Sequence, residues 1–203
     1  MNVLHRLYEQ LPEEIRLRST RIGEVTKLMA AYANQLPAQY GFENMKQLAL
    51  ATLEGCKYHD IGLLINHTLL IPGSHDTRYT LGEIFDQHPI YSKKIVDFLG
   101  DEVFDKENVQ VIQDLCLYHH EKYDGSGYPY GLEKNEIPLL SALCGMAFDI
   151  DQRIYNPDKN NINIFHEITD MITRKTTDWY SPTAKSCFIK AKNEIFEYYL
   201  SLS

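Results

Sequence analysis

Apolar residues recur every three or four positions along most of the chain, the spacing that gathers them on one face of an α-helix. Ile22, Val25 and Met29 show it clearly, within a long helix that we predict over residues 13–36. No segment alternates polar and apolar residues as a half-buried strand would. Further helices are predicted to end near Pro12 and to span residues 44–58, 108–121, 138–154, 164–174 and 182–200.

Breaks between these helices are marked by turn-forming residues. The segment Thr80-Leu81-Gly82-Glu83 has the form of a capping box, so we predict that a helix starts there. This helix would carry His88, with Pro89 as a point of interruption. Residues 122–136 are rich in glycine and are expected to form a loop, and residues 156–163 are polar and turn-like.

The chain length favours one domain over residues 1–203, because 203 residues can bury a core of useful size. No repeat, low-complexity tract or linker divides it. We therefore predict a single all-α domain, a bundle of about seven to nine helices. Residues 1–12 would form an N-terminal helical extension of it.

The charge balance narrows the class of ligand. The formal net charge is -8, and no dense run of lysine and arginine is present, which argues against a general nucleic-acid binder. An anionic substrate would therefore need a local source of positive charge, for which a bound metal ion is the obvious candidate.

The four cysteines lie in apolar helical stretches without a C-x-x-C pair, so we expect buried free thiols in a reduced compartment. They are Cys56, Cys116, Cys144 and Cys187. Residues 1–16 lack the apolar core of a signal peptide, and no apolar stretch approaches the length of a membrane span. We therefore expect a cytoplasmic protein without a membrane partner.

Four of the eight histidines stand in contexts that suit a metal ion: the dipeptide His59-Asp60, His88, and the pair His119-His120. Neutral imidazole together with carboxylate favours iron, manganese, zinc or nickel over calcium. Asp60 could bridge two ions through its two oxygens. The other four are interpreted as surface or core residues. They are His5, His67, His75 and His166.

The order of these motifs resembles the HD-GYP family. Residues 119–132, with the sequence HHEKYDGSGYPYGL, are similar to its signature loop, and residues 59–62 and 88–89 are similar to its H-D-I-G-K and H-P motifs. The resemblance extends over about residues 14 to 190. It implies an all-α bundle that hydrolyses cyclic di-GMP with two or three metal ions, with Asp60 as a catalytic metal ligand.

The glycine-rich loop has its own physical interpretation. Gly125 and Gly127 permit positive φ and close approach of backbone to a ligand, and Pro129 stiffens the loop. Tyr128, which follows Asp124 in this loop, offers a flat face and a hydroxyl for a nucleobase or a partner protein. The alternative is a purely structural connection between helices.

Three positions depart from the family pattern. Arg18 stands where the resemblance places an early histidine, Leu63 where it places the lysine of H-D-I-G-K, and Phe148 where it places a late aspartate. None of these side chains can ligate a metal at neutral pH. Weaker candidates for the missing ligands are Glu14, Asp149 and Asp151.

These departures predict one well-formed metal site, at Asp60, His88, His119 and His120, and a crippled or empty second site beside His59. Iron or manganese is the expected ion, with zinc or nickel as alternatives. Three hypotheses follow. The chain is a phosphodiesterase of weak or altered activity on cyclic di-GMP; or a degenerate module that binds a cyclic dinucleotide or a signalling protein; or a phosphohydrolase of another nucleotide.

Overall fold

The computed structural model describes residues 2–65, 85–156, 159–160, 164–173 and 178–202. These residues are almost entirely helical, which confirms the predicted all-α class. The helices are α1 (Val3–Tyr8), α2 (Glu13–Ala30), α3 (Leu36–Gln39), α4 (Met45–Tyr58), α7 (His88–Leu99), α8 (Lys106–Tyr118), α9 (Leu139–Ile154), α10 (Phe165–Thr173) and α11 (Pro182–Leu200). Single 3₁₀ turns lie at η1 (Gly100–Glu102) and η2 (Lys134–Glu136).

The helix boundaries follow local capping chemistry. Asn44, Asp105 and Ser181 each accept a hydrogen bond from a backbone N–H in the first turn of α4, α8 and α11, respectively. Such caps satisfy the N–H groups that a helix start leaves unpaired. The helices predicted at 44–58, 108–121 and 182–200 therefore begin within two residues of their expected positions.

One helix prediction needs correction. The single helix expected over residues 13–36 is divided, since α2 ends at Ala30 and α3 begins at Leu36. Pro37, in the first turn of α3, has no N–H to continue an earlier helix. The interruption expected near Pro89 is present: residues 85–86 are helical, Gln87 is a turn residue, and α7 begins at His88 with Pro89 in its first turn, where proline is tolerated. The capping box at Thr80 lies outside the described residues.

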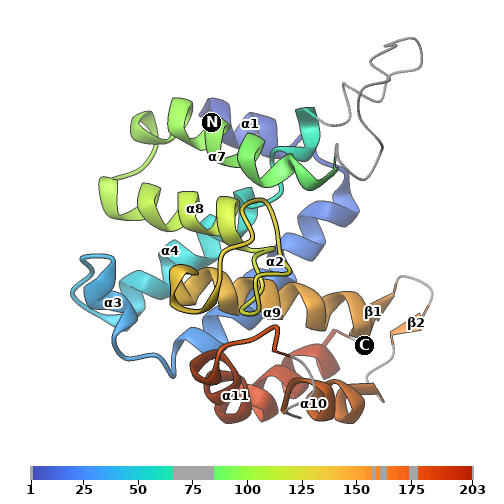
Figure 1. Cartoon of the computed structure of the whole chain (residues 1–203). Helices are drawn as coiled ribbons and strands as arrows, with labels where there is room; N and C mark the ends of the chain where they lie inside the picture. The colour runs from blue at the N-terminus through green and yellow to red at the C-terminus, as the bar shows by residue number, and fades with distance from the viewer. Residues whose placement is uncertain (1, 66–84, 157–158, 161–163, 174–177, 203) are drawn as a thin grey trace.

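Helix α2 lies at the centre of the bundle and contacts α4, α9 and α11, while α8 contacts α4, α7 and α9 (Figure 1). The apolar face of α2 places Ile22, Val25 and Met29 in the main core. A second apolar cluster lies around Tyr58 and Ile112, at the α7 side of the molecule. The bundle therefore brings the C-terminal ends of α4 and α8 close to α2.

Helix α1 packs onto the second cluster, where Leu4 and Leu11 are buried, and it contacts α7. In the polar segment expected to be turn-like, β1 (Tyr155–Asn156) and β2 (Lys159–Asn160) pair in antiparallel register. This two-residue pairing does not change the fold class. Among the described helices, none combines the length and apolar character that crossing a bilayer requires.

Candidate metal centre

Asp60 lies at the end of α4, in the turn that follows the C-cap residue His59. Its side chain is only 1% exposed. The turn rests directly on α7, because a Cβ atom on Gly62 would lie 2.2 Å from the carbonyl oxygen of His88. The Gly62 N–H donates to Ser92 Oγ at 2.8 Å. Glycine at this position therefore lets Asp60 approach His88 closely.

The two carboxylate oxygens of Asp60 face different surroundings. Oδ1 lies 3.1 Å from His88 Nε2 and 3.6 Å from His119 Nε2. Oδ2 lies 2.7 Å from Arg18 Nη2, on α2, and 3.4 Å from His59 Nε2. The residue thus has a histidine side and an arginine side.

Backbone carbonyl groups fix the tautomers of three histidines. Nδ1 lies 2.7 Å from the Cys56 oxygen in His59, 2.6 Å from the Phe85 oxygen in His88 and 2.8 Å from the Leu115 oxygen in His119. A carbonyl oxygen can only accept, so each Nδ1 carries the hydrogen and each neutral ring presents a lone pair on Nε2. Metal-ligating histidines are held in this way.

Burial favours the neutral form of three of the histidine rings at the centre. Burial lowers the pKa of His59 to about 4 and also lowers the pKa of His119 and His120. Burial alone would raise the pKa of Asp60, but the surrounding histidines outweigh it and hold that pKa well below its usual range. At neutral pH the centre therefore combines neutral imidazoles with a carboxylate, the protonation state that binds a divalent metal.

Unsatisfied polar atoms show that these residues fit a cation. Nε2 of His88 and Nε2 of His119 lie 3.2 Å apart with both Nδ1 atoms already donating, so two lone pairs face each other. Asp60 Oδ1 is buried without a hydrogen-bond partner. Ligand atoms of Asp60, His88, His119 and His120 all lie within 4.8 Å of one another. This is the group predicted as the well-formed site.

His59 lies outside this four-residue group, on the arginine side of Asp60. Its Nε2 is buried and has no hydrogen-bond partner. Arg18 and Phe148, the two residues that replace expected ligands, contact each other on the same side, with Arg18 Cζ 5.1 Å from the ring centroid. The side of Asp60 where a second metal site was expected is thus occupied by a guanidinium and an aromatic ring.

The weaker candidate ligands lie elsewhere. Glu14 is exposed in the first turn of α2. Asp149 accepts from Lys122 Nζ and from the Tyr180 hydroxyl. Asp151 accepts two hydrogen bonds from Arg21 and one from Tyr199. The structure therefore brings none of these three carboxylates into the four-residue group.

The glycine-rich loop covers the centre from α8 to α9. The Tyr128 ring stacks on His120 with centroids 4.5 Å apart and an interplanar angle of 25°. Gly127 has no room for a side chain, because a Cβ atom would lie 2.3 Å from the Lys122 nitrogen. Asp124 accepts from the Ser126 N–H at 3.0 Å, within the turn. The loop thus presents Tyr128 at the mouth of the centre.

Glu121 is a residue whose role the sequence analysis missed. Its buried carboxylate accepts from the Tyr130 N–H at 2.8 Å and the Leu132 N–H at 2.9 Å, and so fastens the second half of the loop to its start. The available signal was its position directly after His119-His120, at the end of the helix predicted over residues 108–121. A charged residue is buried only when it is well paired, as Glu121 is.

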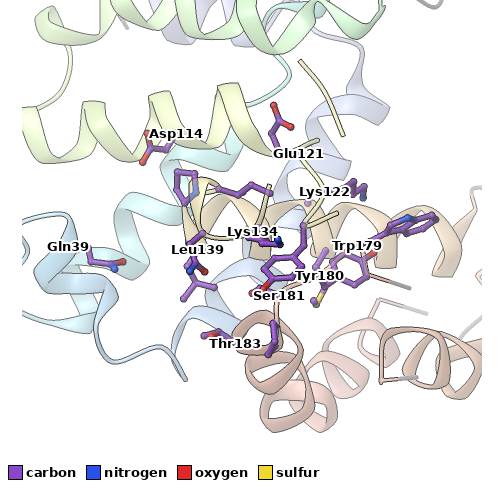
Figure 2. A pocket seen from close by; sticks show the side chains of 18 of the residues that line it. Gln39, Asp114, Glu121, Lys122, Lys134, Leu139, Trp179, Tyr180, Ser181 and Thr183 are labelled. Atoms are coloured by element: carbon purple, nitrogen blue, oxygen red, sulfur yellow. The ribbon is translucent and has the colours of Figure 1, made fainter. Parts of the chain in front are cut away.

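Two cavities flank Lys122. One, of about 470 Å³, opens onto the centre and is lined by Arg18, Leu63, His88 and Tyr128 among others. The second, of about 830 Å³, lies on the other side of the loop, with Lys122, Trp179 and Tyr180 in its wall (Figure 2). The smaller cavity suits a ligand that reaches the centre, because Asp60, His88 and His120 are among its lining residues.

Known proteins share this sequence pattern. A family model described as an HD domain matches residues 9–183. The chain is 30% identical over 146 residues to a protein of Thermotoga maritima named cyclic di-GMP phosphodiesterase, covering 70% of the chain and 37% of that relative. It is 27% identical over 161 residues to a Vibrio cholerae protein of the same name, covering 76% and 32%.

A second Vibrio cholerae protein, named 3'3'-cGAMP-specific phosphodiesterase 2, is 27% identical over 144 residues, covering 70% of the chain and 26% of that relative. The chain therefore spans only about a third of the length of the curated relatives it matches. The family match over most of the chain, together with the histidine centre and the loop beside it, shows that the chain belongs to the HD domain family and, within it, to the HD-GYP type.

Proposed function

We propose that the chain is a metal-dependent phosphodiesterase that acts on a cyclic dinucleotide, with Asp60, His88, His119 and His120 as the metal ligands. The observation that carries the proposal is the convergence of these four side chains, with their ligand atoms within 4.8 Å, beside an open cavity that three of them, Asp60, His88 and His120, line. The relatives named for cyclic di-GMP and 3'3'-cGAMP support this substrate class.

The metal ion and the side chains around it have separate roles in the proposed reaction. The chemistry that a divalent transition metal supplies when bound is Lewis-acid activation of water and of a phosphoryl oxygen. The hydrogen bonds that Nδ1 of His59, His88 and His119 donate to backbone carbonyl oxygens keep the rings oriented toward Asp60. Tyr128, stacked on His120, borders the cavity where a base of the substrate would enter. Iron or manganese is the proposed ion.

Hydrolysis of defined substrates tests this function. Protein loaded with Fe(II) or Mn(II) is assayed with cyclic di-GMP, 3'3'-cGAMP, linear pGpG and a chromogenic phosphodiester. We expect turnover of at least one cyclic dinucleotide, and its loss in His120→Ala. His166→Ala is the matched control, because His166 is exposed on α10. Absence of turnover from every loaded sample of the wild type would exclude the proposal.

A second candidate function is binding without hydrolysis. It is favoured by the arginine side of Asp60, where Arg18 and Phe148 replace metal ligands, and by Leu63, which brings no charge to the cavity. In this case the chain binds a cyclic dinucleotide or a signalling protein through the loop that carries Tyr128. Calorimetric titration with cyclic di-GMP, and a pull-down that requires Tyr128, would detect it in protein that shows no turnover.

A further inference from the structure

Arg18 is a charged side chain at the centre that the proposed chemistry leaves without a role. It comes from the first half of α2, and its side chain is 23% exposed where it lines the cavity of about 470 Å³. The guanidinium is anchored by one hydrogen bond, from Nη2 to Asp60 Oδ2 at 2.7 Å. It therefore has a fixed position at the edge of the ligand cavity.

Among the residues that the structure describes, few partners use the hydrogen-bonding capacity of Arg18. A guanidinium has five N–H donors, and the bond to Asp60 is the one hydrogen bond that Arg18 makes to the described part of the chain. Its Nε is buried without a partner. Arg16 Nε is also unpaired, but Arg16 does not line this cavity, so an unpaired nitrogen alone does not distinguish Arg18. The distinction is the placement of its free donors beside the four-residue centre.

The charge balance of the cavity indicates which class of ligand these donors would bind. Lys122, a second cation in the wall, is neutralised by Asp149. Asp60 contributes one negative charge. A divalent ion on its histidine side and Arg18 on its other side would together carry a larger positive charge. The cavity would thus carry net positive charge, with a forked donor that matches the oxygens of a phosphate.

We propose that Arg18 binds a phosphoryl oxygen of the substrate, and that its guanidinium takes the Oδ2 side of Asp60, so that the centre holds one metal ion per chain. The inference rests on the proposed function, since it deepens the substrate contacts of the same site. Phe148 supports the arrangement by packing against the guanidinium at 5.1 Å, which leaves that side of Asp60 without a second carboxylate.

Anion titration together with metal counting tests this assignment. The 203-residue wild type and the variants Arg18→Gln, Arg18→Lys and Arg16→Gln are loaded with Mn(II), and the bound metal is counted by mass spectrometry. Each is then titrated calorimetrically with inorganic phosphate and with a phosphorothioate analogue of cyclic di-GMP. Arg16→Gln is the matched control, because it removes the same charge from the same helix outside the cavity.

We expect one ion per wild-type chain and no fewer in the variants. Loss of the charged hydrogen bond should weaken binding of both probes roughly 10- to 100-fold in Arg18→Gln. Arg18→Lys should recover part of this loss, since it retains the charge without the fork. Arg16→Gln should stay within about twofold of the wild type, and circular dichroism should show all variants folded.

Three results would overturn the assignment: two ions per wild-type chain, no phosphate binding by the wild type, or equal phosphate binding by Arg18→Gln. The proposed hydrolysis fails differently. If the wild type holds one ion and binds phosphate through Arg18 but turns over no cyclic dinucleotide, the oxyanion site is supported and the proposed hydrolysis is excluded.

Discussion

Two arginines one helical turn apart on α2 each pair with an aspartate from another part of the chain. The two pairs differ in how completely their polar atoms are hydrogen-bonded. Arg21 donates through Nε and Nη2 to both oxygens of Asp151, at 2.8 and 2.9 Å, and its Cζ lies 3.6 Å from the Tyr155 ring centroid. Tyr199 adds a third hydrogen bond to Asp151. Both charged groups of this closed pair are almost fully buried.

The pair of Arg18 and Asp60 is open. Within the described parts of the chain it has one hydrogen bond, leaves Asp60 Oδ1 and Arg18 Nε unpartnered, and borders a cavity. In the closed pair both oxygens of Asp151 accept hydrogen bonds, and within the described residues no polar atom of the pair is buried without a partner, whereas unsatisfied buried polar groups are costly and call for an explanation. The comparison therefore separates a structural pair from a binding pair on the same helix.

The largest expected effect is loss of the ion from the open pair. Asp60→Asn removes the ligand charge, and we expect bound metal to fall from one ion per chain to nearly none, with activity lowered at least about 1,000-fold. Metal counting after dialysis measures the first quantity. Asp151→Asn is the comparison variant, and metal loss of the same size there would erase the distinction between the pairs.

Breaking the closed pair should instead destabilise the fold. Asp151→Asn leaves the buried Arg21 charge without its partner, a change that costs about 3–5 kcal/mol. Thermal unfolding of the metal-free protein should show a melting temperature lower by roughly 6–20 °C. A shift below about 2 °C would mean that the pair contributes little to stability.

Acid should lower the free energy of unfolding of the metal-free protein through His59, which lies beside the open pair. The folded-state pKa of His59, about 4, lies below its unfolded value near 6.5, so the unfolded state binds more protons between these values. Stability should therefore fall by about 3 kcal/mol as pH drops from 6.5 to 4. Urea titrations across this range measure it. His5→Gln should keep this dependence, whereas His59→Asn should reduce it.

The smallest effect concerns the third bond of the closed pair. Tyr199→Phe removes the hydroxyl that donates to Asp151 at 2.8 Å and should cost about 1.5–3 kcal/mol, as for a hydrogen bond to a charged group. Urea unfolding measures the change. Tyr198→Phe, at the adjacent position, is the control and should be nearly neutral. Equal effects of the two substitutions would argue against a specific role of Tyr199.

Much of this molecule could be predicted from local sequence. Periodicity and caps predicted the helices, since these signals act over a few residues. The division of α2 from α3 was missed because apolar spacing continues across it. The grouping of Asp60 with His88, His119 and His120 came from the resemblance, while periodicity alone says nothing of contacts between distant helices.

Side-chain pairing across the bundle could not be predicted. Arg18 was interpreted as a lost ligand, and its bond to Asp60 depends on the distance between α2 and the end of α4. Asp151 was a weak metal candidate because one-dimensional counting cannot show that Arg21 occupies it. Burial of Glu121 likewise depends on the fold of the loop that it fastens.

The closed pair also has a geometric consequence. Residues three apart on a helix share a face, so Arg18 and Arg21 rotate together when α2 turns about its axis. The two-point clamp between Arg21 and Asp151 restricts that rotation. The clamp fixes the rotation of α2 relative to α9. The direction of the Arg18 side chain is therefore determined one helical turn away, by a contact that lies outside the ligand cavity.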